Sequence, residues 1–203
     1  GSWFDIAVGV EWCIKKDADI INMSLGGGYN ALMEMTVERA LKSGAVIIAS
    51  AGNDYGQPIS YPAAYPGVLA VTSGSMYSVS ASTELVDTTM LVPLSPAERE
   101  EVNVVWSEPG ISSLKDASDF YSFFTNLGPQ ADFMAPGDGI LSACMGGGYC
   151  IKSGTSMSAP LVSGIAALAA ADNYLRSEPL ELADILKAAA LKVDGLGQTA
   201  QEI

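Results

Sequence analysis

Residues 154–171 read GTSMSAPLVSGIAALAAA, a polar start that leads into a long run of small apolar side chains. The run from Leu161 to Ala171 is apolar on nearly every side, which predicts a helix buried between layers. Pro160 is expected in the opening turn of that helix, where its missing N–H costs nothing. Ser156 is then predicted at the helix N-terminus, beside free backbone N–H groups and the positive end of the helix dipole. Taken alone, the same Gly-Thr-Ser sequence also fits an ordinary helix cap.

Two further apolar runs end in glycine: residues 19–28 read DIINMSLGGG and residues 45–53 read AVIIASAGN. Each is predicted to be a buried parallel strand whose C-terminal end opens into a loop, where α/β sheets place their functional sites. A third strand is expected at 68–72. The helices expected around these strands span residues 3–16, 31–43 and 179–191. This alternation predicts a three-layer α/β fold with a parallel sheet.

These motifs, together with YPAAYP at 61–66 and FMAPG at 133–137, resemble in order and spacing the subtilisin-like serine proteases, or subtilases. The resemblance runs from about Phe4 to Leu191. It implies a serine endopeptidase that works through an acyl-enzyme, with Ser156 as the nucleophile. It also implies that the side chain of Asn53 is a donor of the oxyanion hole, which stabilises the negative charge that develops on the substrate carbonyl.

The resemblance assigns substrate contacts to two short segments. The residues that match the edge along which family substrates pair as an added strand are Ser24, Leu25 and Gly26. The residues that match one wall of the pocket for the substrate side chain are Ser50, Ala51 and Gly52. Ser60 is a candidate for the floor of that pocket. Without the resemblance, Asn53 reads as a loop residue that tolerates a left-handed backbone, and Gly26–Gly28 as a flexible turn.

The chain contains no histidine, the residue that usually accepts the proton of an attacking serine hydroxyl. In subtilases the Asp and the His of the catalytic triad lie on segments that precede everything matched here. We therefore expect the C-terminal part of a catalytic domain, inactive by itself, with the missing N-terminal part as its partner. Lys152 is a poor substitute for the base, because the extended run before Ser156 does not fix it near the hydroxyl.

Two other functions stay open. A truncated sheet would expose an unpaired edge strand, so the chain could be a non-catalytic piece that binds other proteins or itself. An acid protease of the sedolisin family, whose base is Glu, would fit a histidine-free chain with an isoelectric point of about 4.1. Sedolisins place Asp where this chain has Asn53, although Asp54 is its neighbour.

Composition restricts the partners. With 203 residues, 49% of them hydrophobic, the chain can build one sizeable core, and no apolar run is long enough to span a membrane. A formal net charge of −13 argues against nucleic acid, which is bound through Lys and Arg at phosphates. The resemblance instead implies polypeptide substrates, a secreted protein and catalysis without a cofactor. It also allows a structural calcium ion at the backbone oxygens of the Tyr61–Pro66 loop, while no other metal site can be assigned.

Three cysteines are present. Cys144 and Cys150 flank a glycine-rich loop that is flexible enough to close a disulfide, as would suit an oxidising compartment, but only geometry can decide this. Cys13 is expected to be a buried small apolar residue on a helix.

Residues 76–118 interrupt the resemblance, between subtilase segments at 3–75 and 119–203. Within them, Ser95 begins a sequence typical of a helix cap, and residues 102–106 could form a strand. The insertion is a trimmed relative of the protease-associated domain of larger subtilases, a different module, or a surface excursion.

Overall fold

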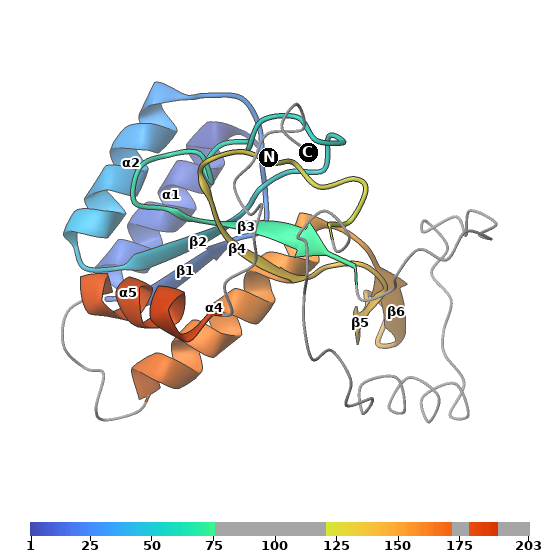
Figure 1. Ribbon diagram of the computed structural model, residues 1–203. Coiled ribbons are helices and arrows are strands. Elements are labelled where there is room, and N and C mark those ends of the chain that lie inside the picture. Colours follow the sequence, from blue (N-terminus) through green and yellow to red (C-terminus); the bar gives the residue numbers. More distant parts are fainter. Residues whose placement is uncertain (76–120, 172–178, 191–203) are drawn as a thin grey trace, which may run out of the picture.

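The computed structural model of the chain describes residues 1–75, 121–171 and 179–190 (Figure 1). Its helices are α1 (Trp3–Lys15), α2 (Ala31–Lys42), α4 (Thr155–Ala171) and α5 (Pro179–Ala189). Its strands are β1 (Ile20–Met23), β2 (Val46–Ser50), β3 (Leu69–Gly74), β4 (Ala131–Pro136), β5 (Ile140–Ala143) and β6 (Tyr149–Lys152). The insertion expected at 76–118, with its helix and strand, lies outside the described residues.

Four strands form a parallel sheet in the order β1-β2-β3-β4. The register sets Ile21 beside Ile47, and Ala49 beside Ala70. Helices α1 and α2 lie on one face of the sheet, and α4 and α5 on the other (Figure 1). The predicted three-layer α/β fold with a parallel sheet is confirmed.

The sheet is buried on both faces, and successive residues of β2 face opposite layers. Ile47 belongs to a core that includes Met33 and Val37 of α2. Ile48, the next residue, belongs to a second core with Ala159 of α4. All five residues of β2 are buried, which explains why its sequence is a continuous apolar run rather than an alternating one.

Local signals set the helix ends. The Ser2 hydroxyl accepts a hydrogen bond from the N–H of Asp5, and the Asp5 carboxylate accepts one from the N–H of Ser2, a capping box that begins α1. Asn30 caps α2, because its side-chain oxygen accepts from the N–H of Met33. Gly44, with φ of 99°, follows the end of α2, where this backbone conformation favours glycine.

Helix α4 differs from the prediction in two respects. It begins at Thr155, so Pro160 is its sixth residue and lies inside the helix rather than in its opening turn. The helix is also buried mainly on the side that faces the sheet. The apolar side chains exposed on its outer side are Leu161, Ile165 and Leu168. None of the helices in the described ranges, α4 included, combines the length and apolarity needed to cross a membrane.

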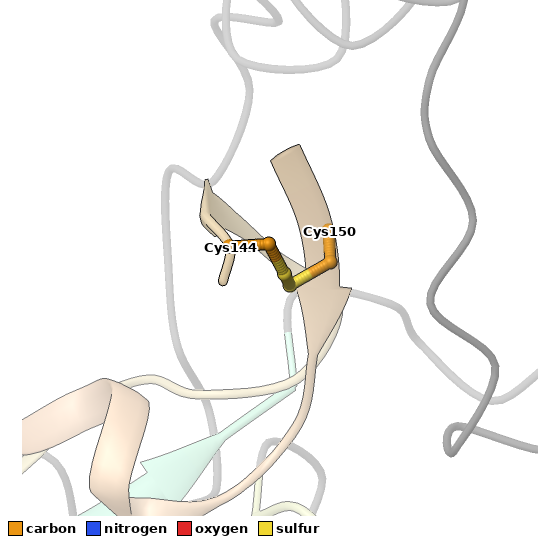
Figure 2. The surroundings of a disulfide bond; sticks show 2 residues. All are labelled: Cys144 and Cys150. Carbon is orange, nitrogen blue, oxygen red and sulfur yellow. A yellow bond between two sulfur atoms is a disulfide. The ribbon is translucent and has the colours of Figure 1, made fainter. Parts of the chain in front are cut away.

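Strands β5 and β6 form an antiparallel hairpin that leads into α4. A disulfide between Cys144 and Cys150 closes it, with their Cα atoms 5.7 Å apart (Figure 2). The bond between these two cysteines, which the sequence left open, is therefore formed. Cys13 is a free, partly buried thiol that packs against the core on the α1 side, close to the expectation for a small apolar residue.

Candidate active site

Ser156 is the second residue of α4 and follows directly on the loop from β6. The N–H of Gly154 donates to the carbonyl of Gly137 at 2.7 Å, which ties this loop to the end of β4. A side chain at Gly137 would collide with Ser158 and Ser73, so only glycine permits this close approach. The N–H of Ser156 belongs to the first turn of α4, whose N–H groups have no carbonyl partner within the helix.

Asn53, in the loop after β2, reaches the N-terminus of α4. Its side-chain oxygen accepts from the N–H and from the hydroxyl of Thr155, both at 2.9 Å. The Thr155 hydroxyl in turn accepts from the N–H of Gly52 at 3.2 Å. Because its oxygen is engaged, the amide group of Asn53 keeps its N–H donors for a ligand in the cavity that Asn53 and Ser156 both line. Thr155 was not identified from the sequence, although it stands directly before Ser156.

A cavity of about 310 Å³ opens beside these residues. The residues that line it are Gly26, Gly27, Ser50, Gly52, Asn53, Asp54, Ser60, Thr155 and Ser156. A side chain at Gly52 would collide with Ser60, and one at Gly26 would come within 3.3 Å of the Ser60 Cβ atom. The side chain of Ser60 therefore lies between the two segments, and its role as the floor of the pocket stays a prediction.

The other three predicted substrate residues contribute in different ways. Ala51 is fully buried in the core and is not among the residues that line the cavity; its carbonyl accepts from the N–H of Ser60 at 2.8 Å. Leu25 packs against the same core, and its carbonyl accepts from the hydroxyl of Ser50 at 3.3 Å. Ser24 lies against α4 and donates its hydroxyl hydrogen to the carbonyl of Ser156 at 2.9 Å.

Asn126, in the segment before β4, bonds to the loop that lines the cavity. It was not identified from the sequence. It is fully buried. Its side-chain oxygen accepts from the N–H of Asp54 at 2.6 Å. Its amide nitrogen, which has two hydrogens, lies within bonding distance of the Asp54 carboxylate, the Pro58 carbonyl and the Ser60 hydroxyl, at 3.1, 3.1 and 3.3 Å. Asn126 thus holds the loop after Asn53 in its shape.

The described residues offer no base in hydrogen-bond contact with the Ser156 hydroxyl. That hydroxyl lies 3.4 Å from the backbone carbonyl of Ser24. The side chain of Lys152 is exposed on β6. Asp54 also lines the cavity, and its carboxylate accepts from the amide nitrogen of Asn126 at 3.1 Å. In the part of the chain that the structure describes, no three His, Cys, Asp or Glu side chains cluster in a way that could hold a metal ion.

Comparison with known proteins finds similar sequences and structures. The model of the subtilase family matches residues 1–201. A thermostable alkaline protease of Halalkalibacterium halodurans is 30% identical over 203 residues, which cover 97% of this chain and 45% of that protein. Subtilisin NAT of Bacillus subtilis subsp. natto is 34% identical over 173 residues, covering 82% of this chain and 34% of that protein.

A halolysin-like extracellular serine protease of Natrialba magadii is 33% identical over 170 residues, covering 83% of this chain and 24% of that protein. Among solved structures, a cold adapted subtilisin-like serine proteinase superposes with a TM-score of 0.69 at 29% identity, covering 98% of this chain and 58% of the other. The chain thus spans between about a quarter and a half of the curated relatives it matches.

Proposed function

The chain belongs to the subtilase family, and from this premise we propose that it carries the nucleophile and the oxyanion hole of a serine endopeptidase. The reaction would be hydrolysis of a peptide bond through an acyl-enzyme on Ser156. The substrates would be polypeptides that pair along the segment Ser24–Gly26 and insert one side chain into the cavity above Ser60.

The contact between Asn53 and the N-terminus of α4 carries this proposal. Two hydrogen bonds from Thr155 fix the side-chain oxygen of Asn53, and the amide N–H groups then share a cavity with the Ser156 hydroxyl. A carbonyl attacked by Ser156 would develop its negative charge between the Asn53 amide and the Ser156 backbone N–H. Such preorganised donors stabilise the transition state without having to reorient during the reaction.

The proton of the Ser156 hydroxyl must go to a base. The usual base is histidine, and this chain has none. We propose that a segment with the triad Asp and His supplies it in the complete protein, and that the chain by itself is inactive. The sedolisin-like alternative draws no support from the site, because Asn53 rather than an acid holds the position at the α4 N-terminus.

A serine-directed phosphonate tests the proposal. In the complete protein it should label Ser156, as located by mass spectrometry, and the label should disappear in Ser156→Ala but persist in Ser43→Ala, a matched serine outside the site. The chain alone should remain unlabelled until it is mixed with the segment that carries the Asp and the His. A complete protein that resists the phosphonate, or reacts at another serine, would contradict the assignment.

A non-catalytic role in association is the second candidate. One observation favours it: β1 is at the end of the described sheet, and α4 exposes Ile165 by 58% and Leu168 by 76%. An unpaired strand edge beside exposed apolar side chains recruits partners. The test is a pull-down with the chain and its Ser156→Ala variant. A partner that both bind with the same affinity, and that the unsubstituted complete protein does not cleave, would favour this role.

Two further expectations stay predictions. Secretion fits the disulfide and the relative described as extracellular. Calcium at the backbone oxygens of the Tyr61–Pro66 loop is the other: the carbonyls of Tyr61 and Pro62 each accept one backbone hydrogen bond, and each keeps a second lone pair that could be a ligand. A calcium titration followed by thermal unfolding would test it, since bound calcium would raise the unfolding temperature.

A further inference from the structure

The carbonyl of Ser156 lacks its helical partner. In an α-helix the carbonyl of residue i accepts from the N–H of residue i+4. For Ser156 that residue is Pro160, which has no N–H. A carbonyl without a partner in the first turn would leave the backbone of the candidate nucleophile poorly restrained.

The hydroxyl of Ser24 takes the place of that N–H. From the loop after β1, Ser24 Oγ donates to the Ser156 carbonyl at 2.9 Å. In the opposite direction, Ser156 Oγ lies 3.4 Å from the Ser24 carbonyl, a long and weak contact. The two serines thus contact each other through both side chains, although 132 residues separate them in the sequence.

Ser24 is itself oriented. Asn22 Nδ2 donates to Ser24 Oγ at 3.0 Å, so the single hydrogen of that hydroxyl is left for the Ser156 carbonyl. Asn22 Oδ1 lies 3.0 Å from the hydroxyl of Ser163, further along α4. The Ser163 hydroxyl is also 2.9 Å from the Ala159 carbonyl, so its hydrogen is shared between the two oxygens. These contacts connect the end of β1 to α4 at two points.

We propose that Ser24 is a positioning residue for Ser156: its hydroxyl replaces the helix hydrogen bond that Pro160 removes and holds the nucleophile against the substrate-pairing edge. The proposal rests on the proposed protease function. Since Ser24 belongs to the segment where the substrate backbone would pair, the contact fixes the distance between Ser156 and a bound scissile carbonyl. Misplacement of reacting groups by about 1 Å can cost on the order of 10²-fold in rate.

The pair of residues allows a rescue experiment in the complete protease. Ser24→Ala should lower kcat by about 10- to 100-fold with little change in KM, because substrate backbone pairing does not use the Ser24 side chain. In the double variant Ser24→Ala/Pro160→Ala, the new N–H of residue 160 can bond to the Ser156 carbonyl, and most of the lost kcat should return. Ser24→Thr retains the hydroxyl and should stay active, and Pro160→Ala alone should be close to the unsubstituted protein.

Ser43→Ala is the matched control, because the Ser43 hydroxyl also donates to a helix carbonyl, that of Ala40 at 2.7 Å, but outside the site. It should leave kcat unchanged. NMR of the isotope-labelled Ser156 carbonyl carbon gives a readout that needs no turnover: its resonance should move upfield in Ser24→Ala and return in the double variant.

The outcomes separate the proposal from the proposed function. Full kcat in Ser24→Ala would overturn the positioning role. The positioning role would also be overturned if kcat of the double variant stayed low while its Ser156 carbonyl resonance returned to the position seen in the unsubstituted protein. If the unsubstituted complete protein shows no turnover, the protease function fails, and the carbonyl resonance decides alone: no shift in Ser24→Ala overturns the contact.

Discussion

At the scale of the residue, Asn53 has two tasks that a single substitution separates. Its oxygen accepts from Thr155, and in the proposed function its amide hydrogens would bind a substrate oxyanion. Asn53→Asp keeps the oxygen and the size but loses the donor and adds a negative charge. We expect correct folding and a fall in kcat of about 10²- to 10³-fold, the loss known for removal of this donor in a subtilisin.

Steady-state kinetics and a thermal unfolding curve check this prediction. Asn53→Ala is the companion variant, because it removes the Thr155 contacts as well and should lower stability in addition to kcat. If Asn53→Asp instead gained activity in acid, the sedolisin-like interpretation would replace the oxyanion role.

Ser60 is the residue whose replacement should change specificity. Its side chain stands between Gly26 and Gly52, so it limits the depth of the cavity. Ser60→Gly removes the side chain and leaves the cavity deeper. We expect the ratio of kcat/KM for a substrate with a large apolar side chain before the scissile bond to that for a substrate with alanine there to rise about 10-fold.

A panel of peptides that differ only at that position measures the ratio. Ser43→Gly is the control, because it alters a serine outside the cavity and should leave the ratio unchanged. An unchanged ratio in Ser60→Gly would mean that the substrate side chain enters elsewhere.

Single residues were predictable where a short motif contains them. Gly52 and Asn53 stand at the end of an apolar run and Ser156 stands before another, and the structure brings them to one cavity. Thr155 and Asn126 were missed because their roles arise from side chains that meet only after folding: Asn126 contacts a loop that precedes it by 66 to 72 residues. No local pattern marks such a contact.

At the scale of the element, helix α2 depends on a tyrosine from the loop that ends in Pro66. Tyr65 is buried, and its hydroxyl donates to the carbonyl of Asn30 at 2.7 Å and accepts from its N–H at 3.1 Å. Because Asn30 is the cap of α2, Tyr65→Phe should lower the free energy of unfolding by about 1 kcal/mol at neutral pH. Urea unfolding measures this, with Tyr55→Phe as the exposed control.

The same residue predicts a loss of stability in alkali. Burial raises the pKa of Tyr65 above its ordinary value of 10.0. The folded state therefore holds this proton more tightly than the unfolded chain, so its contribution is complete below pH 10.0 and is lost as the pH rises through the folded pKa. In Tyr65→Phe the free energy of unfolding should fall less steeply with pH above 10.0. Part of the fall should remain, because the hydrogen bond from the Tyr29 hydroxyl to Glu34 raises the pKa of Tyr29 as well. Parallel alkaline curves for the two proteins would contradict the prediction.

Elements were predictable from the sequence where burial gives a continuous signal. Strands β1 and β2 are apolar runs that end in glycine, and the helix at 31–42 lies between a cap and Gly44. Strands β4 and β5 were not predicted: β4 is only partly buried and ends in Pro136, and β5 has no buried residue, so neither gives a continuous apolar signal. Their pairing comes from β3 and from β6 with its disulfide, which are contacts between segments.

At the scale of the whole molecule, the apolar outer side of α4 should govern association. Helix α4 lies across the sheet, and Leu168 and Ile165 are exposed by 76% and 58%. Because neither side chain is buried in this chain, Ile165→Lys/Leu168→Lys should fold as before but repel a second apolar surface. We expect the unsubstituted chain to self-associate in the micromolar range, where exposed apolar surfaces and strand edges cause aggregation, and the double variant to stay monomeric.

Sedimentation velocity over a range of concentrations measures this difference. Met35→Lys is the matched control, since Met35 is exposed by 64% on α2, on the opposite face of the sheet, and should not change the association.

The double variant Ile165→Lys/Leu168→Lys should also fail to combine with the segment that carries the triad Asp and His, and so should stay unlabelled by the phosphonate in the mixture. A monomeric unsubstituted chain would contradict the predicted self-association. Equal labelling of the unsubstituted chain and the double variant in the mixture would show that the outer side of α4 does not bind the segment with the triad Asp and His.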